Sequence, residues 1–308
     1  MHQSFFNKCC GWCIQASLLL ASFAVGAAEF SLSVADIVTP DFSARGITLT
    51  LPEDGSADLR IAELHVRQRD LRKVQLHCAH FELSTASVSC RSGRLDAVPG
   101  MAVDFGYRFG DGSWQVAAQL RNVLGKSLGN LWPKDMPQLT QGALHGTLRI
   151  SGNASGTDAF DADIQLAEVG FSDASDLHAA EKLRGSIKFA AARKAALWTW
   201  QGNLVWQSGE MFWQPLYLSG TGGRSLSASG SFDGAHLKVE QAIVDLPEAG
   251  RVQFTALWDV MQGTLVECSA HGSNLALEKL FDDYAKPFLD KGALAESHLY
   301  GHADVDWQ

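Results

Sequence analysis

Proline and charge are both scarce in this chain of 308 residues. It has 8 prolines against 29 glycines, and charged residues make up 19% of it, below the quarter typical of globular proteins. Positive charge is the scarcer sign, because 25 Lys and Arg stand against 34 Asp and Glu and give a net charge of −9. Such an acidic balance argues against nucleic-acid binding. With 46% hydrophobic residues the chain has enough apolar material for a core, so disorder is excluded for most of its length.

Motifs that carry catalysis or hold metals are missing as well. No GxSxG or HExxH occurs, and Gly152–Gly156 carries its serine one place too late for a nucleophile elbow. The glycine-rich stretch 220–224 has no lysine and no following helix, so it indicates a hairpin turn rather than a phosphate loop. His77 and His80 would point to opposite faces of a strand, which prevents joint coordination of a metal. We therefore predict that the protein is not an enzyme and uses neither cofactor nor metal.

Long hydrophobic runs are absent except at the N-terminus. After Lys8 the chain is uncharged from Cys9 to Ala28, and small residues precede Glu29 as a signal peptidase site requires. The uncharged run is about 20 residues, which is also long enough to span a membrane. Residues 1–28 are thus predicted to be a signal peptide or a membrane anchor, and in both cases the body is exported.

The rest of the chain shows the period-two alternation of β-strands. Ile47, Leu49 and Leu51 alternate with threonines, and glycine-containing turns separate most of the later runs. Regular strands with such turns predict a mainly β protein, an elongated, curled antiparallel sheet. Later strands are expected over 102–109, 114–121, 143–151, 160–171, 184–192, 197–207, 211–219, 225–232, 235–245, 251–259 and 263–271.

Two short helices interrupt the strands and suggest an internal repeat. Residues 274–284 have apolar side chains at helical spacing with Asn274 as a cap, and residues 122–132 are a weaker counterpart. Each is followed by a similar glycine-containing block, so we predict an N-terminal β region, 29–121, a helix-plus-strands unit, 122–273, and the start of a second unit, 274–308. Because the chain stops within a strand pattern, a longer protein is expected.

Three cysteines lie in the body of the chain. Cys78 and Cys90 are 12 residues apart on two predicted strands joined by Ser84–Ser87, so they are expected to face each other across a hairpin. Export permits a disulfide between them, and two buried free thiols are the alternative. Cys268 has no evident partner and is expected to pack as a small apolar residue.

The region 197–215 concentrates aromatic residues on one strand face. Trp198, Trp200, Leu204 and Trp206 share one parity, and Phe212 and Trp213 follow in the next predicted strand. Two interpretations stay open. The rings either fill the core of an ordinary β-sandwich or line a surface that holds lipid.

Taken together, the chain resembles the AsmA-like superfamily, in the branch typified by YdbH and TamB. The resemblance covers most of residues 29–308, without an invariant signature, and it rests on the segments 78–95, 142–152, 200–206 and 209–215. It implies an elongated sheet curled into a β-groove, anchoring in the inner membrane and passage of phospholipid toward the outer membrane.

The sequence thus predicts a periplasmic, non-enzymatic protein that holds or conducts phospholipid along an apolar groove. Its expected partners are phospholipid, the inner membrane and other envelope proteins, with no nucleic acid. The groove candidates are Trp198, Trp200, Leu204, Trp206, Phe212 and Trp213. A structural or assembly component of a secretion system, binding protein partners through its sheet edges, is the alternative. A hydrolase with unrecognised site residues is a third.

Overall fold

The computed structural model describes residues 29–38, 42–66, 69–129, 137–175, 177–214, 216–218, 221–282, 286 and 297–308. The predicted signal peptide or membrane anchor at 1–28 lies outside these ranges. No helix in the described part of the chain is both long enough and apolar enough to cross a membrane.

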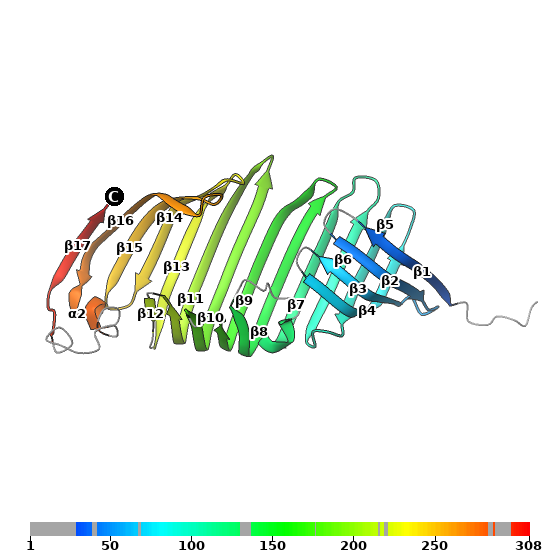
Figure 1. The fold of residues 1–308 in the computed structure, drawn as a ribbon, viewed down its shortest axis with the longest axis horizontal. Coiled ribbons are helices and arrows are strands. Elements are labelled where there is room, and N and C mark those ends of the chain that lie inside the picture. The colour runs from blue at the N-terminus through cyan, green and yellow to red at the C-terminus, as the bar shows by residue number, and fades with distance from the viewer. Residues whose placement is uncertain are drawn as a thin grey trace, which may run out of the picture.

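The described chain forms one 17-stranded antiparallel sheet that follows chain order along the long axis of the molecule (Figure 1). Each strand pairs with the one before it, except that β13 pairs with β11 because the short β12 folds back on the end of β11. The strands are β1 (Phe30–Val38), β2 (Phe42–Leu51), β3 (Ala57–Val66), β4 (Arg69–Leu83), β5 (Ser87–Leu95), β6 (Met101–Arg108), β7 (Trp114–Leu124), β8 (Gln138–Asn153), β9 (Gly156–Ser172), β10 (His178–Lys194), β11 (Leu197–Trp213), β12 (Leu216–Leu218), β13 (Thr221–Phe232), β14 (His236–Leu246), β15 (Gly250–Asp259), β16 (Thr264–Ala276) and β17 (His302–Trp307).

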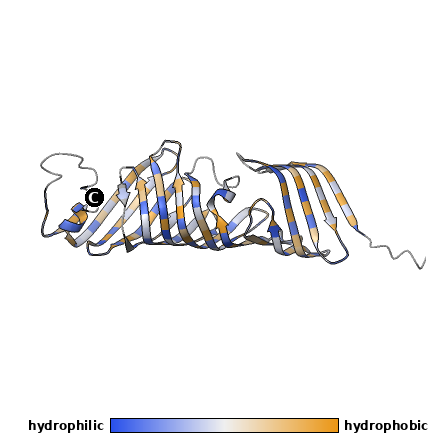
Figure 2. Ribbon diagram, turned by 90° about the horizontal axis from the view of Figure 1, so that it is seen from below, coloured by the Kyte–Doolittle hydropathy of each residue, from blue (hydrophilic) through white to orange (hydrophobic). Residues whose placement is uncertain are grey.

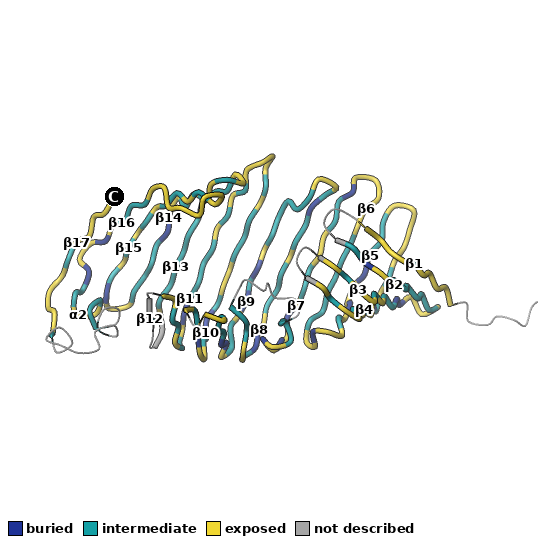
Figure 3. Tube along the Cα trace, viewed as in Figure 1, coloured by how far each residue is buried: buried dark blue, intermediate teal, exposed yellow. Residues whose placement is uncertain are grey.

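The predicted fold class is confirmed, since the sheet is elongated, curled and unclosed. Within the described residues no pairing joins β1 to β17. Because the sheet has no second sheet packed against it in these residues, the alternative of a β-sandwich core is wrong. Figure 3 shows the result, with half-buried and exposed residues along most strands and few fully buried ones.

The predicted division of residues 197–219 into two strands is wrong. Leu197 to Trp213 form the single long strand β11, and only Leu216–Leu218 make a further short strand. Ser208 and Gly209, which fall between the two predicted strands, lie at a shift in the register between β11 and β13 and beside the bulge of β10. Gly209 has a φ of 111°, which explains why a glycine stands there.

The two predicted helices begin later than expected, because strand pairing extends into their first residues. The helix α2 covers Leu277–Leu280, the helical conformation continues through Phe281 and Asp282, and residues 283–285 lie outside the described part. Asn274 does not cap this helix but lies in β16 with a φ of 54°. The counterpart at 122–132 is a 3₁₀ helix, η1, over Gly125–Leu128, while residues 130–136 lie outside the described part.

Both helices follow the same kind of bulge. At each bulge an asparagine takes a left-handed conformation, and its backbone N–H is bound by the side chain opposite: Asn122 by His145 Nδ1 at 3.2 Å, and Asn274 by Asp304 Oδ1 at 2.7 Å. The next residue turns inward and is buried, Val123 in one case and Leu275 in the other. The division into an N-terminal β region and repeat units stays a prediction.

The predicted hairpin between β4 and β5 carries a disulfide bond between Cys78 and Cys90. The two cysteines are not register partners, since Cys78 lies opposite Gly93 and Cys90 opposite Phe81. Both are almost completely buried and form a small core with Ala57. A larger core gathers around β7–β9, with Leu120, Val123, Leu144, Ala162, Ile164 and Val169 among its members.

Removal of this disulfide should weaken the β3–β6 region selectively. A bond that closes a loop of this length contributes about 3 kcal/mol in the chain-entropy model, and strands in an elongated sheet depend mainly on their neighbours. We expect the double variant Cys78→Ser, Cys90→Ser to lose hydrogen-exchange protection in β4 and β5 while β14 and β15 keep theirs. Cys268→Ser is the matched control and should change neither region. Equal loss of protection along the whole sheet would contradict this expectation.

Candidate functional site: an apolar trough

A cavity of about 690 Å³ opens on one face of the sheet, over β6–β11 and η1. Of its 19 lining residues, 18 are apolar and one, Arg184, is charged. The lining residues come from six strands, which can surround one cavity only if the sheet curls toward this face. The apolar face is therefore the concave one here, and we call the hollow along it the trough.

The apolar face continues beyond this cavity, because apolar residues meet in register across the sheet. One register row joins eleven strands from β6 to β17, over about 50 Å at the usual strand spacing. Its members, each opposite the next, are Met101, Leu120, Gly146, Ile164, Ile187, Leu204, Leu226, Val244, Val252, Gly272 and Val305. A second row, Leu32, Leu49, Leu59, Leu76 and Leu95, crosses β1–β5. Figure 2 shows the corresponding alternation of hydrophobic and hydrophilic residues along the strands.

Bulges shape the deep part of the trough. Register shifts interrupt the pairing of each neighbouring pair from β7 to β11, and the residues around them line the cavity. A bulge bends its strand and increases the local twist, so a row of bulges bends the sheet as a whole. Gly185 lies in this region between Leu166 and Trp206, and a Cβ atom there would come within 2.2 Å of the carbonyl oxygen of Val205. Only glycine fits so close an approach.

Three of the six predicted groove residues line the cavity: Leu204, Trp206 and Trp213. Trp206 is the most buried, with 9% of its surface exposed, whereas Trp213 is 45% exposed and contacts the ring of Phe171 edge-on. Trp198 and Trp200 share the parity of Trp206 but lie farther along β11, outside the cavity. Trp200 stacks on Phe189, and Trp198 lies under the Arg193 guanidinium.

Phe212 does not line the cavity. It lies between Met211 and Trp213, which do, so its side chain points to the other face of β11. The parity of residues 198–206 does not extend to it, because the chain shifts register near Ser208.

Most of the cavity lining was not selected from the sequence. Leu144, Leu148, Phe160, Ile164 and Ile187 come from β8–β10, whose strands were predicted but whose apolar positions were not proposed as a site. The signal was the same alternation that marked the strands. The sequence did not show which strands would contribute their apolar side chains to one common cavity once the sheet curled.

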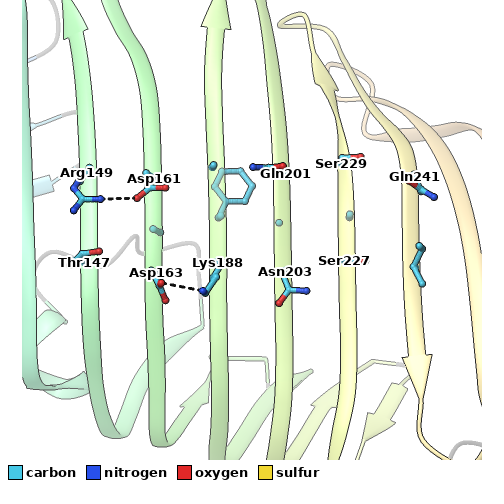
Figure 4. Close-up of a pocket in the computed structure, with 16 residues that line it drawn as sticks. Thr147, Arg149, Asp161, Asp163, Lys188, Gln201, Asn203, Ser227, Ser229 and Gln241 are labelled. Carbon is cyan, nitrogen blue, oxygen red and sulfur yellow. Dashed lines mark ion pairs between the residues drawn. The ribbon is translucent and has the colours of Figure 1, made fainter.

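The opposite face is polar and holds a shallow hollow of about 760 Å³ over β8–β14 (Figure 4). Asp161 and Asp163 lie on it, each paired across strands with a cation: Arg149 at 3.5 Å and Lys188 at 3.5 Å. Amides and hydroxyls complete the surface, from Gln201, Asn203, Ser227, Ser229 and Gln241. These ion pairs are largely exposed to solvent, so they add little stability. We therefore interpret this face as a solvated surface.

Histidine–carboxylate pairs recur along the chain, and none of them forms a metal site in the described ranges. His77 Nδ1 lies 2.9 Å from Asp58, and no group of three His, Cys, Asp or Glu side chains in the described part is placed to hold a metal ion. The pair of His178 and Asp173 differs from the others in position. It is partly buried, and the His178 ring lies 4.1 Å from the ring of Trp213 at the trough.

Comparison with known proteins found no matching family model, no matching curated protein and no matching solved structure. The function of the trough must therefore be inferred from its geometry and chemistry.

The Asp173–His178 pair makes a prediction about acid stability. The hydrogen bond from His178 lowers the pKa of Asp173 from 3.8 to about 2, assisted by Ser175, while partial desolvation opposes the shift. Because the pKa is lower in the folded protein, this carboxylate stabilises the fold above pH 3.8, and that contribution is lost as the pH falls to about 2.

Asp173→Asn should remove this acid-dependent contribution. We expect the variant to be less stable than the parent at pH 6 and the difference to shrink between pH 4 and pH 2. Thermal unfolding followed by circular dichroism across that pH range measures it. Identical pH dependence in the two proteins would show that the pair does not contribute.

Proposed function

We propose that this protein is a non-enzymatic envelope protein that holds or conducts phospholipid along the trough. The observation that carries the proposal is the apolar register row from Met101 to Val305, on a face that no second sheet covers within the described residues. Exposed apolar surface on this scale marks a site for an apolar ligand or partner. Acyl chains fit the site because they need burial but no directional bonds.

The dimensions of the trough favour acyl chains over a compact ligand. The row extends about 50 Å, several times the roughly 15 Å that one lipid leaflet's chains occupy in a membrane. Each methylene that leaves water for the trough contributes about 0.8 kcal/mol. A lining that is apolar apart from Arg184 lets a chain bind at many positions, as sliding along the sheet requires.

Localisation and family belong to the same proposal. The uncharged N-terminal segment supports export to the periplasm with attachment to the inner membrane, and the disulfide between Cys78 and Cys90 suits an oxidising compartment. An elongated, curled sheet with an apolar concave face supports membership of the AsmA-like superfamily. The lipid would then pass toward the outer membrane, between partners at the two ends of the sheet.

An assembly component that binds protein through a sheet edge is the second candidate. The edge strand β1 favours it, since Phe30, Leu32 and Val38 are all strongly exposed. Such an edge is a template for pairing with another strand. This candidate does not explain an apolar cavity in the middle of the sheet.

A charge placed in the trough should abolish lipid retention without unfolding the protein. Ile187 lines the cavity and is 37% exposed, so Ile187→Glu places a carboxylate among acyl chains at modest cost to the fold. We expect phospholipid that co-purifies with the parent protein, measured by native mass spectrometry, to fall at least about tenfold, because an ionised carboxylate next to hydrocarbon is strongly disfavoured.

Gln201→Glu is the matched control. It introduces the same charge one strand away, on the polar face. This variant should keep its lipid and its melting temperature. Equal lipid content in all three proteins, or a lipid-free parent bound to a stoichiometric protein partner, would favour the assembly alternative.

A further inference from the structure

Large apolar side chains are exposed at two neighbouring hairpin turns, β4–β5 and β6–β7. Leu83, Tyr107 and Phe109 are 60%, 37% and 48% exposed. Val88 joins two of them, because it is the register partner of both Leu83 and Tyr107. The rings of Tyr107 and Phe109 meet edge-on with their centroids 5.6 Å apart, and Trp114 is the register partner of Tyr107. We call Leu83, Tyr107, Phe109 and Trp114 the rim patch.

The turns on either side of the rim patch are polar. Every second turn of an antiparallel meander lies on the same rim of the sheet, so the β2–β3 and β8–β9 turns are the neighbours of the patch. Residues 52–56 read Pro-Glu-Asp-Gly-Ser, and residues 153–155 read Asn-Ala-Ser. Single exposed apolar residues are normal on a protein surface, but a cluster between polar turns indicates a contact site.

The backbone at the rim patch is already hydrogen-bonded within the protein. The N–H of Phe109 donates to the carbonyl of Ala86 at 2.8 Å, which ties the two turns together, and the N–H of Arg108 donates to the carbonyl of Ser113 at 2.9 Å. The indole N–H of Trp114 donates to a backbone carbonyl at the end of β8 at 3.2 Å. Because an unsatisfied polar group is costly in hydrocarbon, bonds of this kind lower the cost of placing the turns in an apolar medium.

The rim patch is continuous with the cavity through two strands. Alternate residues of one strand point to the same face, and Met101 and Leu120 line the cavity. The two apolar stripes are Tyr107, Phe105, Val103 and Met101 on β6, and Trp114, Val116, Ala118 and Leu120 on β7. Each extends about 20 Å from the rim to the cavity, compared with roughly 15 Å for the acyl chains of one lipid leaflet. The stripes are therefore long enough to shelter an acyl chain between the rim and the cavity.

The composition of the rim patch fits the interface of a phospholipid bilayer. Tyr and Trp favour the level between headgroups and hydrocarbon, because each ring has an apolar body and a polar tip. Arg108 and Asp111, the charged side chains at the β6–β7 turn, pair with each other at 3.6 Å, so contact depends on apolar insertion rather than on lipid charge. A bilayer also supplies acyl chains to the stripes, whereas a protein seated on the patch would close them.

We propose that the rim patch docks on a phospholipid bilayer and that acyl chains pass from the bilayer along β6 and β7 into the cavity. This inference rests on the proposed function and adds to it the place where the trough meets a membrane. Only the two apolar turns enter the bilayer, and the polar turns beside them stay at the headgroups or in water.

Hydrogen exchange of the full chain, with and without phosphatidylcholine vesicles, tests the docking. We expect the vesicles to slow exchange in residues 83–88 and 107–113, because inserted turns lose contact with water. Exchange in the polar turn at 153–156 should stay unchanged. Both turns are compared within one protein, so any contact that residues 1–28 make with the vesicles does not affect the comparison. The protection should be equal at low and high salt, since apolar insertion is not screened.

A variant assigns the protection to the patch. Phe109→Glu replaces an exposed ring by a charge, and the vesicles should then no longer protect residues 83–88. Ala154→Glu places the same charge in the neighbouring polar turn, where the residue is exposed, and is the matched control that should keep the protection. Both variants should keep the melting temperature of the parent. If Phe109→Glu does not fold, the comparison of turns in the parent still decides the question.

The outcomes separate this inference from the proposed function. If the parent retains phospholipid but vesicles protect neither apolar turn, the docking is refuted and the trough stands. If vesicles protect the turns but the parent retains no phospholipid, the docking stands and the function of the trough fails. Equal protection of the polar turn, or protection that disappears at high salt, would overturn the assignment to the rim patch. Protection that grows with protein concentration without vesicles would also overturn it, and would identify the patch as an interface between copies of the chain.

Discussion

The structure depends on one constraint: a single-layer antiparallel sheet has an apolar face that no second layer covers. Backbone hydrogen bonds between neighbouring strands hold the sheet together, but they bury little apolar surface. Curling toward the apolar face is the means by which the described chain shelters its hydrophobic side chains. Among the few fully buried residues, Val123 and Cys90 lie next to register shifts, and Val98 packs in the core around β7–β9.

The same constraint relates stability to function. An apolar face that a sandwich would bury remains half exposed here, so the chain keeps a hydrocarbon-like surface next to water. A ligand that covers this surface would stabilise the protein as it binds. Charged residues are largely kept off the apolar face. Arg149 and Lys188 pair with Asp161 and Asp163 on the polar face, and Arg184, at the edge of the cavity, pairs with Glu168.

Sequence patterns predicted much of the fold for a physical reason. Period-two alternation is a local property of each strand, so strands such as 114–121 and 251–259 were found close to their true positions. The hairpin at Ser84–Ser87 was predictable because its turn is held by local bonds, with the Ser84 hydroxyl accepting from the backbone of Ala86 and Ser87. The helices at 122–132 and 274–284 were predicted to begin too early because strand pairing with distant residues, such as Val123 with Leu144, overrides local helical spacing.

By itself, therefore, the sequence determined the class of fold, the meander of strands and the pairing of Cys78 with Cys90. It also determined that Leu204 and Trp206 lie on the same face of one strand. Each of these depends on neighbours along the chain or on residue type. Tertiary structure alone decided that the rows join in register over eleven strands and that β8–β10 form most of the cavity wall. Those relations depend on the bulges and on the curl of the sheet. Both accumulate over many strands, and the sequence of any single strand gives little sign of them.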